Sequence, residues 1–443
     1  MTIRQPELTR EAIAHREVGH TNVRPGTARF LLAAFLLFIC AVPLFEVAAS
    51  RGDRDSVRPW DHLLGIPSQV YTTEVEQAPR WRHVVAVNRI VISGLHAFEE
   101  ALEDTSRVGQ LLRPPAQLVM SERLGAGNEL TYIGREGWLF YPPDVEYVTG
   151  AGFLDEAARG RRALTTDEWK TLPHSDPRPA IVGFKQMLEA KGITLIVMPT
   201  PLKPAIHPER LSARAATARL PIQNPSYERF IADLRAAGVL VFDPANVMLE
   251  ALRPTSATQY LATDTHWRPE VMEMVADRLA DFLGANVQLR PRNTAYRTQS
   301  VEMTATGDLA VMLDLPGAQT WLEPDSVTVR RVLDASGAPW RPSRQAEVLL
   351  LGDSFTNIYS LASMRWGDAA GFAEHLSRAL RRPIDRIVQN DAGAYATREQ
   401  LHGSPDRLAG KRVVIYQFAT RELSFGDWRV FDGAQEQEGT DAR

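Results

Sequence analysis

The sequence predicts an α/β protein with a parallel β-sheet, preceded by one apolar N-terminal helix. Three observations support this prediction. The chain has 443 residues, 44% of them hydrophobic and 23% charged, which is sufficient for a large buried core. Beyond Gly134, short apolar runs alternate with helical patterns, as they do in parallel α/β domains. An uncharged run of 16 residues, Phe30 to Phe45, precedes that region.

The apolar run predicts a transmembrane helix over residues 30–49, since Val47 to Ala49 extend it past Glu46 to nearly the ~20 residues that a spanning helix needs. A cleavable signal peptide is the alternative, because Val47 to Ala49 resemble a cleavage site, although the preceding residues 1–29 are long for such a peptide. We expect an uncleaved single-pass anchor in the inner membrane. Equal numbers of arginines flank the apolar run, so the charge rule does not decide the orientation in the membrane. We expect a cytoplasmic tail of residues 1–29 and a periplasmic main domain, because that tail is short.

Residues 50–125 are predicted to form a linker and a helical stalk. The apolar spacing from Trp81 to Leu112 fits an amphipathic helix, which Pro114 and Pro115 are expected to end. The main domain is expected over residues 126–431. The polar residues 432–443 are expected to be a disordered tail.

The predicted sheet consists of five short apolar strands separated by amphipathic helices. The strands are expected at 193–198, 239–242, 348–351, 386–388 and 413–418. The helices are expected at 180–190, 227–237, 269–283, 370–380 and 396–408. The less regular stretch 287–342 is expected to be a strand-rich or looped insertion. In open sheets of this kind, ligands bind beyond the carboxyl ends of the strands.

Composition excludes several classes of function. A formal net charge of -4 lacks the basic excess of a protein that coats nucleic acid, so no nucleic-acid partner is expected. The single cysteine, Cys40, excludes an internal disulfide and a cysteine-rich zinc site.

The strongest chemical signal is a buried-type strand that runs into Gly352-Asp353-Ser354-Phe355. A serine on the turn after a central strand has its hydroxyl raised to the sheet edge, where backbone N–H groups can stabilise an oxyanion. This position suits the nucleophile of an acyl transfer. The structural alternative is that Gly352 turns the chain and Asp353 or Ser354 caps the next helix.

A second signal, Asp264-Thr265-His266, lies just before a helix that begins near Pro269. On an extended segment, Asp264 and His266 share one side, so Asp264 can orient the imidazole while His266 removes a proton from Ser354. The alternatives are an N-cap beside a core histidine, or a metal site. No metal is expected, because the other histidines show no metal-binding spacing.

These motifs together resemble the alginate O-acetyltransferase group that includes AlgJ and AlgX, whose domain is SGNH-hydrolase-like. Gly134 to Tyr141 and Pro199 to Pro204 are also similar to that group, so the resemblance covers roughly 134–428. It implies a three-layer α/β/α domain. Ordinary SGNH hydrolases place Ser first and Asp-His last, whereas Asp264 and His266 precede Ser354 here, the permuted order of this group.

Carried over residue by residue, the resemblance makes Ser354 the nucleophile, His266 the general base and Asp264 its orienting carboxylate. It implies a membrane-anchored periplasmic O-acetyltransferase that modifies an alginate-like exopolysaccharide through an acetyl-serine intermediate. The implied partners are the polysaccharide acceptor and a membrane-bound acyltransferase that supplies acetyl groups. No cofactor is expected. A carbohydrate esterase with the same triad and a non-catalytic polysaccharide-assembly scaffold remain the alternatives.

Weaker candidates follow other strands of the predicted sheet. Backbone donors near Gly352 and Gly393 are candidates for the oxyanion site, and Asn390 or Tyr395 for contacts to sugar or acetyl oxygens. Arg421 is a candidate for a uronate carboxylate, although a structural ion pair with Glu422 is favoured. The sequence also makes Lys203 a candidate, because it follows a strand. Trp138 and Trp267 are expected in the core.

Overall fold

The computed structural model describes residues 24–50, 59–72, 80–165, 173–217, 221–255, 258–316, 321–390 and 393–431. Contacts between backbone segments divide the chain into two compact units, Met1–Arg113 and Pro114–Arg443. Most of the predicted cytoplasmic tail and all of the predicted 432–443 tail lie outside the described residues. The domain limits inferred from the sequence stay predictions.

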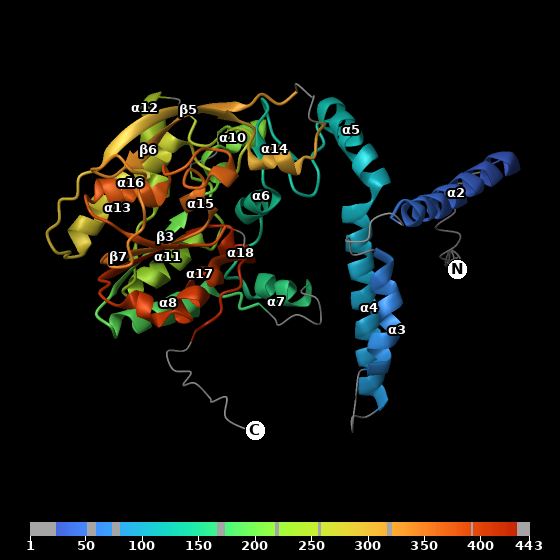
Figure 1. Ribbon diagram of the computed structural model, residues 1–443, viewed down its shortest axis with the longest axis horizontal. Coiled ribbons are helices and arrows are strands. Elements are labelled where there is room, and N and C mark those ends of the chain that lie inside the picture. The colour runs from blue at the N-terminus through green and yellow to red at the C-terminus, as the bar shows by residue number, and fades with distance from the viewer. Residues whose placement is uncertain are drawn as a thin grey trace, which may run out of the picture. The chain divides into compact units, whose positions relative to one another are not determined.

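The first unit is helical. Its helices are α2 (Pro25–Ser50), α3 (Pro59–Thr72) and α4 (Arg80–Thr105). α3 and α4 pack as an antiparallel pair, in which the Trp60 and Phe98 rings lie 5.0 Å apart and Gly94 approaches the side chain of Ile66 (Figure 1). The close approach explains Gly94, because a Cβ there would lie 2.6 Å from Ile66.

The helix predicted from Trp81 to Leu112 ends earlier than expected, and Pro114 and Pro115 do not end it. They lie inside α5 (Arg107–Leu124). The break falls at Ser106 instead, whose Oγ accepts a hydrogen bond of 3.0 Å from the Gly109 N–H and so caps the new helix. This local cap decides where the first helix stops.

The predicted transmembrane helix is not confirmed. Residues 30–49 do lie within a helix, α2. Among the residues that the structure describes, however, no helix has both the length and the apolar character needed to cross a membrane.

The second unit is built around a five-stranded parallel sheet, so this part of the predicted fold is confirmed. The strands are β3 (Thr194–Thr200), β4 (Leu240–Val241), β7 (Val348–Gly352), β8 (Asp385–Val388) and β9 (Val413–Ala419). They are hydrogen-bonded in the order β4-β3-β9-β7-β8. Every residue of β7 and β9 is buried, as expected for strands covered on both faces.

Helices cover both faces of this sheet, which gives three layers (Figure 1). One layer contains α8 (Pro177–Glu189), α11 (Tyr227–Ala236) and α17 (Gly393–His402), and the other contains α12 (Pro244–Thr255), α13 (Pro269–Asn286) and α16 (Phe372–Ala379). The sequence places five of these six helices correctly, with α17 shorter than predicted, and misses α12. The chain leaves β7 for β8 on one side and returns through β9 on the other. Ligands bind at such a switch point, beyond the carboxyl ends of β7 and β9.

The irregular stretch 287–342 contains a long antiparallel pair, β5 (Arg297–Ala305) with β6 (Asp325–Leu333). The short helix α14 (Asp308–Met312) lies between these two strands in the sequence. The strand-rich form of the predicted insertion is therefore confirmed.

Smaller elements complete the second unit. A two-stranded pair, β1 (Tyr132–Ile133) and β2 (Leu139–Phe140), precedes the sheet. The short helices are α6 (Pro142–Thr149), α7 (Glu156–Thr165), α9 (Lys203–Ile206), α10 (Pro208–Leu211), α15 (Ser354–Asn357) and α18 (Glu422–Phe425). Beyond α18, the Trp428 N–H donates a 2.9 Å hydrogen bond to the His174 carbonyl, just before α8.

Candidate active site

Ser354 lies where the sequence predicts, on the turn after β7, an inner strand of the sheet. Asp353 is the N-cap of α15, since its Oδ1 accepts a 2.9 Å hydrogen bond from the Phe355 N–H, and Ser354 is the first residue of that helix. The cap prediction is thus correct for Asp353. Ser354 itself lines a cavity of about 610 Å³.

The turn before Ser354 is held by Gln417 of β9, a residue that the sequence analysis missed. Gln417 Oε1 accepts from the Asp353 N–H at 3.0 Å and from Thr356 Oγ1 at 2.9 Å, while Gln417 Nε2 donates to Asp353 Oδ1 at 2.9 Å. Asp353 Oδ2 also accepts from the Ala419 N–H at 2.7 Å. A Cβ at Gly352 would lie 2.2 Å from Thr356 Oγ1, so only glycine fits this turn.

His266 and Asp264 come together as predicted. The His266 Nδ1–H and the His266 backbone N–H both donate to Asp264 Oδ1, at 2.7 and 3.0 Å. The other oxygen, Oδ2, accepts from Trp366 Nε1 at 2.8 Å and from the Asp308 N–H at 3.1 Å. Four donors therefore fix the Asp264 carboxylate.

The remaining ring nitrogen of His266, Nε2, is buried and is not hydrogen-bonded to any residue that the structure describes. His266 lines the same cavity as Ser354, and its ring packs 4.8 Å from that of Phe355, the neighbour of the serine. Because Asp264 accepts a hydrogen bond from Nδ1–H, the proton of the neutral ring stays on Nδ1 and Nε2 is the free acceptor, which is the tautomer that a general base requires.

Burial and hydrogen bonding act in opposite directions on this pair. Burial raises the pKa of Asp264, but the hydrogen bond and charge of His266 and the hydrogen bond from Trp366 outweigh it and lower the pKa to about 2. Burial likewise opposes the charged form of His266, yet Asp264, with a smaller contribution from Asp308, raises the His266 pKa above its ordinary value. The site therefore keeps a carboxylate beside an imidazole of increased basicity.

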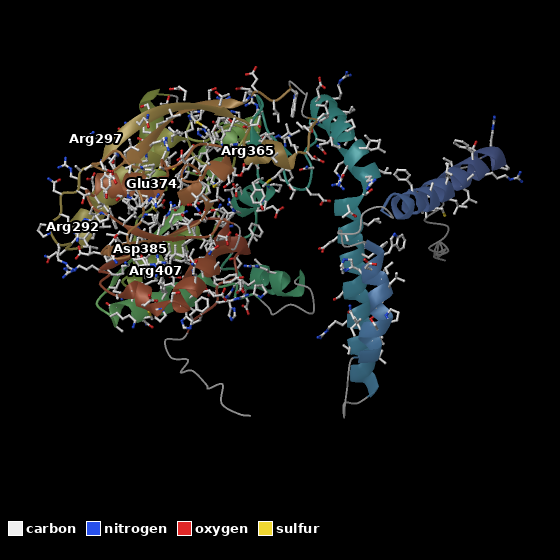
Figure 2. The ribbon with its side chains drawn as sticks, in the orientation of Figure 1. Arg292, Arg297, Arg365, Glu374, Asp385 and Arg407 are labelled. Atoms are coloured by element: carbon white, nitrogen blue, oxygen red, sulfur yellow. The ribbon has the colours of Figure 1, made fainter. Side chains whose placement is uncertain are left out.

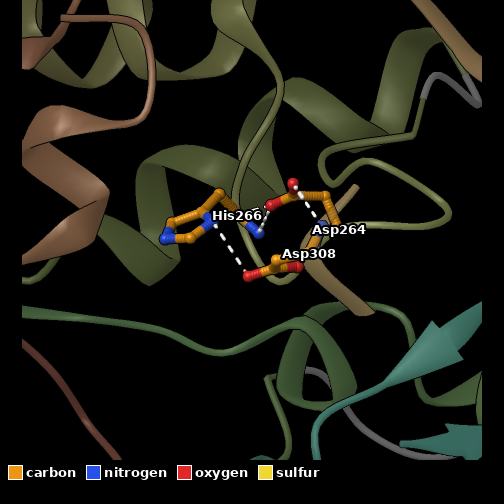
Figure 3. A group of neighbouring side chains, drawn as sticks. All are labelled: Asp264, His266 and Asp308. Atoms are coloured by element: carbon orange, nitrogen blue, oxygen red, sulfur yellow. Dashed lines mark hydrogen bonds and ion pairs between the residues drawn. The ribbon is translucent and has the colours of Figure 1, made fainter. Parts of the chain in front are cut away.

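Asp308, at the start of α14, is the principal site residue that the sequence analysis missed. Its Oδ2 lies 3.7 Å from His266 Nδ1, and its Oδ1 accepts from the Thr265 N–H at 2.8 Å (Figure 3). Burial and the neighbouring Asp264 charge raise its pKa to about 6. The only sequence signal was a Gly-Asp step at the start of a short helical pattern.

Asp264, His266 and Asp308 have the composition of a metal-binding group. The contacts fit a hydrogen-bonded group better. Asp264 Oδ1 is already at hydrogen-bond distance from Nδ1, and Oδ2 is occupied by two N–H donors. A metal between these atoms would have to displace them.

Lys203 lies behind the site and does not line the cavity. Its Nζ is buried and donates to the carbonyl oxygens of Leu139, Ala262 and Asp264 at 2.6, 2.8 and 2.9 Å. Burial lowers its pKa to about 8. Lys203 therefore anchors the loop that carries Asp264 by hydrogen bonds to its backbone.

Arg421 lines the cavity, but its ion-pair partner differs from the one predicted. Its Nη1 donates to Asp144 Oδ1 of α6 at 2.8 Å. Glu422 is turned toward α17, where its Oε2 accepts from the Ala394 N–H at 2.9 Å, so the predicted pair with Glu422 is wrong. Asp144 Oδ2 is buried and has no hydrogen-bond partner among the described residues.

The other weak candidates are divided. Asn390 and Gly393 line the cavity, and Gly393 has a φ of 70°, a conformation that favours glycine. Gly352 and Tyr395 are not among the residues that line it. The Tyr395 ring instead packs against Arg429, whose guanidinium carbon lies 4.0 Å from the ring centroid.

Two tryptophans and one arginine complete the description. Trp138 and Trp267 are buried, as predicted for the core. Arg365 is exposed, lines the cavity and has a φ of 70°, which is unfavourable for a residue with a Cβ (Figure 2). No sequence signal marked Arg365.

The chain matches the family model described as SGNH hydrolase-like domain, acetyltransferase AlgX, over residues 132–420. It is 25% identical over 327 residues to the probable alginate O-acetylase AlgJ of Pseudomonas aeruginosa, with 69% of this chain and 74% of that protein covered. It is also 25% identical over 316 residues to the Pseudomonas putida protein of the same name, with the same two shares covered.

Among solved structures, the fold is similar to that of the O-acetyltransferase domain of Pseudomonas putida AlgJ. The TM-score is 0.50 at 23% identity, and the match covers 66% of this chain and 92% of that domain. The family match covers well over half of the 443 residues and includes Asp264, His266 and Ser354. The chain therefore belongs to the SGNH hydrolase-like acetyltransferase family of AlgX, and it is an O-acetyltransferase.

Proposed function

We propose that the chain transfers acetyl groups to hydroxyl groups of an exopolysaccharide in the periplasm, with Ser354, His266 and Asp264 as its catalytic triad. One observation carries this proposal. His266 Nε2 is buried and unpartnered within the described chain, and it belongs to the same cavity as Ser354, while Asp264 holds Nδ1. A neutral imidazole with a free Nε2 and an Nδ1–H held by a carboxylate is suited to accept the serine proton.

The proposed reaction has two steps. His266 takes the proton of Ser354 Oγ, the oxygen attacks the acetyl carbonyl of a donor, and an acetyl-serine forms. A sugar hydroxyl, deprotonated in turn by His266, then takes the acetyl group. We assign the oxyanion in both steps to backbone N–H groups of the turn after Gly352 and of Gly393, which borders the cavity.

The acceptor is proposed to be an acidic, alginate-like polymer. The curated relatives carry the name alginate O-acetylase, which is the first support. The second is chemical, because Arg365 and Arg421 both line the cavity and a guanidinium can bind a uronate carboxylate through two hydrogen bonds. Asn390 also lines the cavity, and we assign it to a contact with a sugar or acetyl oxygen.

The donor is proposed to arrive through a membrane-bound acyltransferase, since acetyl-CoA is not expected outside the cytoplasm. A single-pass anchor in the inner membrane would keep the catalytic domain, residues 126–431, close to that partner. The support is the apolar run in α2, where side chains such as Phe30, Leu32 and Phe35 are exposed. The proposed chemistry requires no metal or organic cofactor.

The experiment is intact-mass spectrometry of the full chain after incubation with an activated acetyl ester. We expect one added acetyl group, mapped by peptide analysis to Ser354 and absent from Ser354→Ala. Ser363→Ala is the matched control, because Ser363 is a second serine of the same cavity and its loss should leave the adduct on Ser354.

The acceptor is tested by adding an alginate oligosaccharide to the acetylated chain. Faster discharge, with acetyl appearing on the sugar, supports the transferase. Discharge at the same rate with only acetate released supports the esterase instead. A chain that forms no adduct dependent on Ser354 contradicts the proposed mechanism and supports a scaffold.

A further inference from the structure

A second carboxylate, Asp308, faces the same nitrogen of His266 as Asp264 does. Figure 3 shows both carboxylates directed toward the histidine, at 2.7 Å for Asp264 and 3.7 Å for Asp308. The two acids differ in their surroundings. The Asp264 side chain is 2% exposed, whereas that of Asp308 is 32% exposed and borders the open cavity.

Asp308 is locked to the catalytic loop by reciprocal hydrogen bonds. The Asp308 N–H donates to Asp264 Oδ2 at 3.1 Å, and the Thr265 N–H donates to Asp308 Oδ1 at 2.8 Å. The preceding Gly307 lies directly against the loop, since a Cβ there would be 2.3 Å from Asp264 Cβ. The backbone at Gly307 and Asp308 therefore cannot approach the loop further without displacing Asp264, and the Asp308 carboxylate cannot turn away from His266 without losing the Thr265 N–H.

Few other charged groups lie near Asp308 and His266. Asp264 of the same loop, Arg421 beyond β9 and Asp144 of α6 interact electrostatically with His266, and Asp264 also interacts with Asp308. Lys203 of α9 interacts with Asp308, and Asp325 of β6 interacts with Lys203. Lys203 and Asp325 bind backbone atoms of the loop, and Arg421 binds Asp144. Among the described cationic groups, His266 is the one that lies at ion-pair distance from Asp308, at 3.7 Å.

We propose that Asp308 is a positioning residue for acyl transfer, holding the Nδ1–H edge of His266 together with Asp264 and stabilising the imidazolium that forms during the reaction. This inference rests on the proposed function. In the step concerned, Ser354 Oγ loses its proton to His266 Nε2 and bonds to the acyl carbon. The bond from that carbon to the donor's leaving group breaks, and the leaving group departs with the proton that His266 took.

The test is the pH profile of kcat/KM for Asp308→Asn, which keeps an acceptor for the Thr265 N–H but removes the negative charge. Loss of the charge lowers the pKa of His266, so the imidazole stays neutral and active at lower pH. We expect the acid limb of the profile to move down by about one pH unit. The plateau rate should fall about tenfold, because the imidazolium loses a neighbouring anion.

A purely structural role predicts a different result, namely a lower rate with the acid limb in place. Asp325→Asn is the matched control, since Asp325 binds the Ala262 and Thr263 N–H groups of the same loop without facing His266. Its acid limb should stay at the wild-type pH. Asp308→Glu, which keeps the charge, should return the acid limb most of the way to the wild-type pH.

A second measurement separates this inference from the proposed function. The His266 ring is titrated by NMR in a Ser354→Ala chain, with and without Asp308→Asn. A pKa that falls in the double variant supports the inference, even if no acetyl-serine ever forms in the unmutated chain. An unchanged His266 pKa overturns the inference and leaves the proposed triad untouched.

Discussion

The two ends of the central sheet differ in whether their buried acceptor atoms have hydrogen-bond or ion-pair partners. At the amino end, Asp385 of β8 is paired with Arg407 at 2.6 Å and with Lys411 at 3.2 Å (Figure 2). Glu347, just before β7, is likewise surrounded by arginines, and its Oε2 accepts from Arg382 at 3.1 Å. At the amino end the Asp385 and Glu347 carboxylate oxygens are all bonded, whereas at the carboxyl end buried acceptor atoms are left without a partner among the described residues.

His266 Nε2 and Asp144 Oδ2 are the clearest cases, since neither has a partner among the described residues. Buried polar groups are normally satisfied, so those that are not need another explanation. The amino end can be understood from folding alone, because each carboxylate neutralises the cations beside it. Under the proposed function, the free nitrogen of His266 serves the reaction in the cavity that His266 and Ser354 line.

The largest effect is expected when the free nitrogen of the carboxyl end is removed. His266→Gln should slow acetyl transfer to an oligosaccharide by at least about 10³-fold, because no base remains for Ser354. His375→Gln is the matched control. His375 is also fully buried, but it lies away from the cavity, its Nε2 bonds to the Arg330 carbonyl, and burial lowers its pKa to about 3. Equal rate losses in the two variants would break the comparison.

The next effect concerns stability at the amino end. Asp385→Ala should lower the free energy of unfolding by about 3–5 kcal/mol, because Arg407 and Lys411 would lose their buried counter-charge. Urea denaturation measures this loss. The rate per folded molecule should stay near that of the unmutated chain. A loss below about 1 kcal/mol would mean that solvent reaches the pair and screens it.

A smaller effect is expected from Gly307→Ala, because the added Cβ would overlap with Asp264. The Asp264 loop must shift, and a shift of about 1 Å at a catalytic group can cost on the order of 10²-fold in rate. Gly284→Ala is the control, because nothing lies within 4 Å of a Cβ at that helical position. It should leave the rate unchanged and raise stability by up to about 1 kcal/mol.

The smallest effect should come from Arg365→Gly. Glycine adopts the left-handed conformation without the Cβ clash, so the substitution should stabilise the fold by about 1 kcal/mol. KM for an acidic oligosaccharide should rise, because the guanidinium is lost. Arg381→Gly, at a residue with a φ of 50° that does not line the cavity, should stabilise similarly without changing KM. An unchanged KM in Arg365→Gly would remove this residue from the proposed acceptor site.

Most of the central sheet, the pairing of Asp264 with His266 and the turn that carries Ser354 could be predicted from local sequence. Strand β7 is a continuous apolar run, and Ser354 and His266 each lie beside a recognisable turn. Asp308 and Gln417 could not be predicted, because their roles depend on contacts across 44 and 64 residues. The helix end predicted at Pro114 and Pro115 was wrong, since Ser106 caps a new helix that begins before the two prolines.

The hydrogen bond from Trp428 to His174 bears on how the order of the motifs arose. The segment after β9 returns to the point where the chain enters α8 and then β3. Numbered from β7, the strand that precedes Ser354, the sheet order becomes 2-1-3-4-5, as in flavodoxin-like folds. A chain that continued from Trp428 directly into α8 and started before β7 would meet Ser354 first and His266 last. The two motif orders are thus related by circular permutation of one strand order.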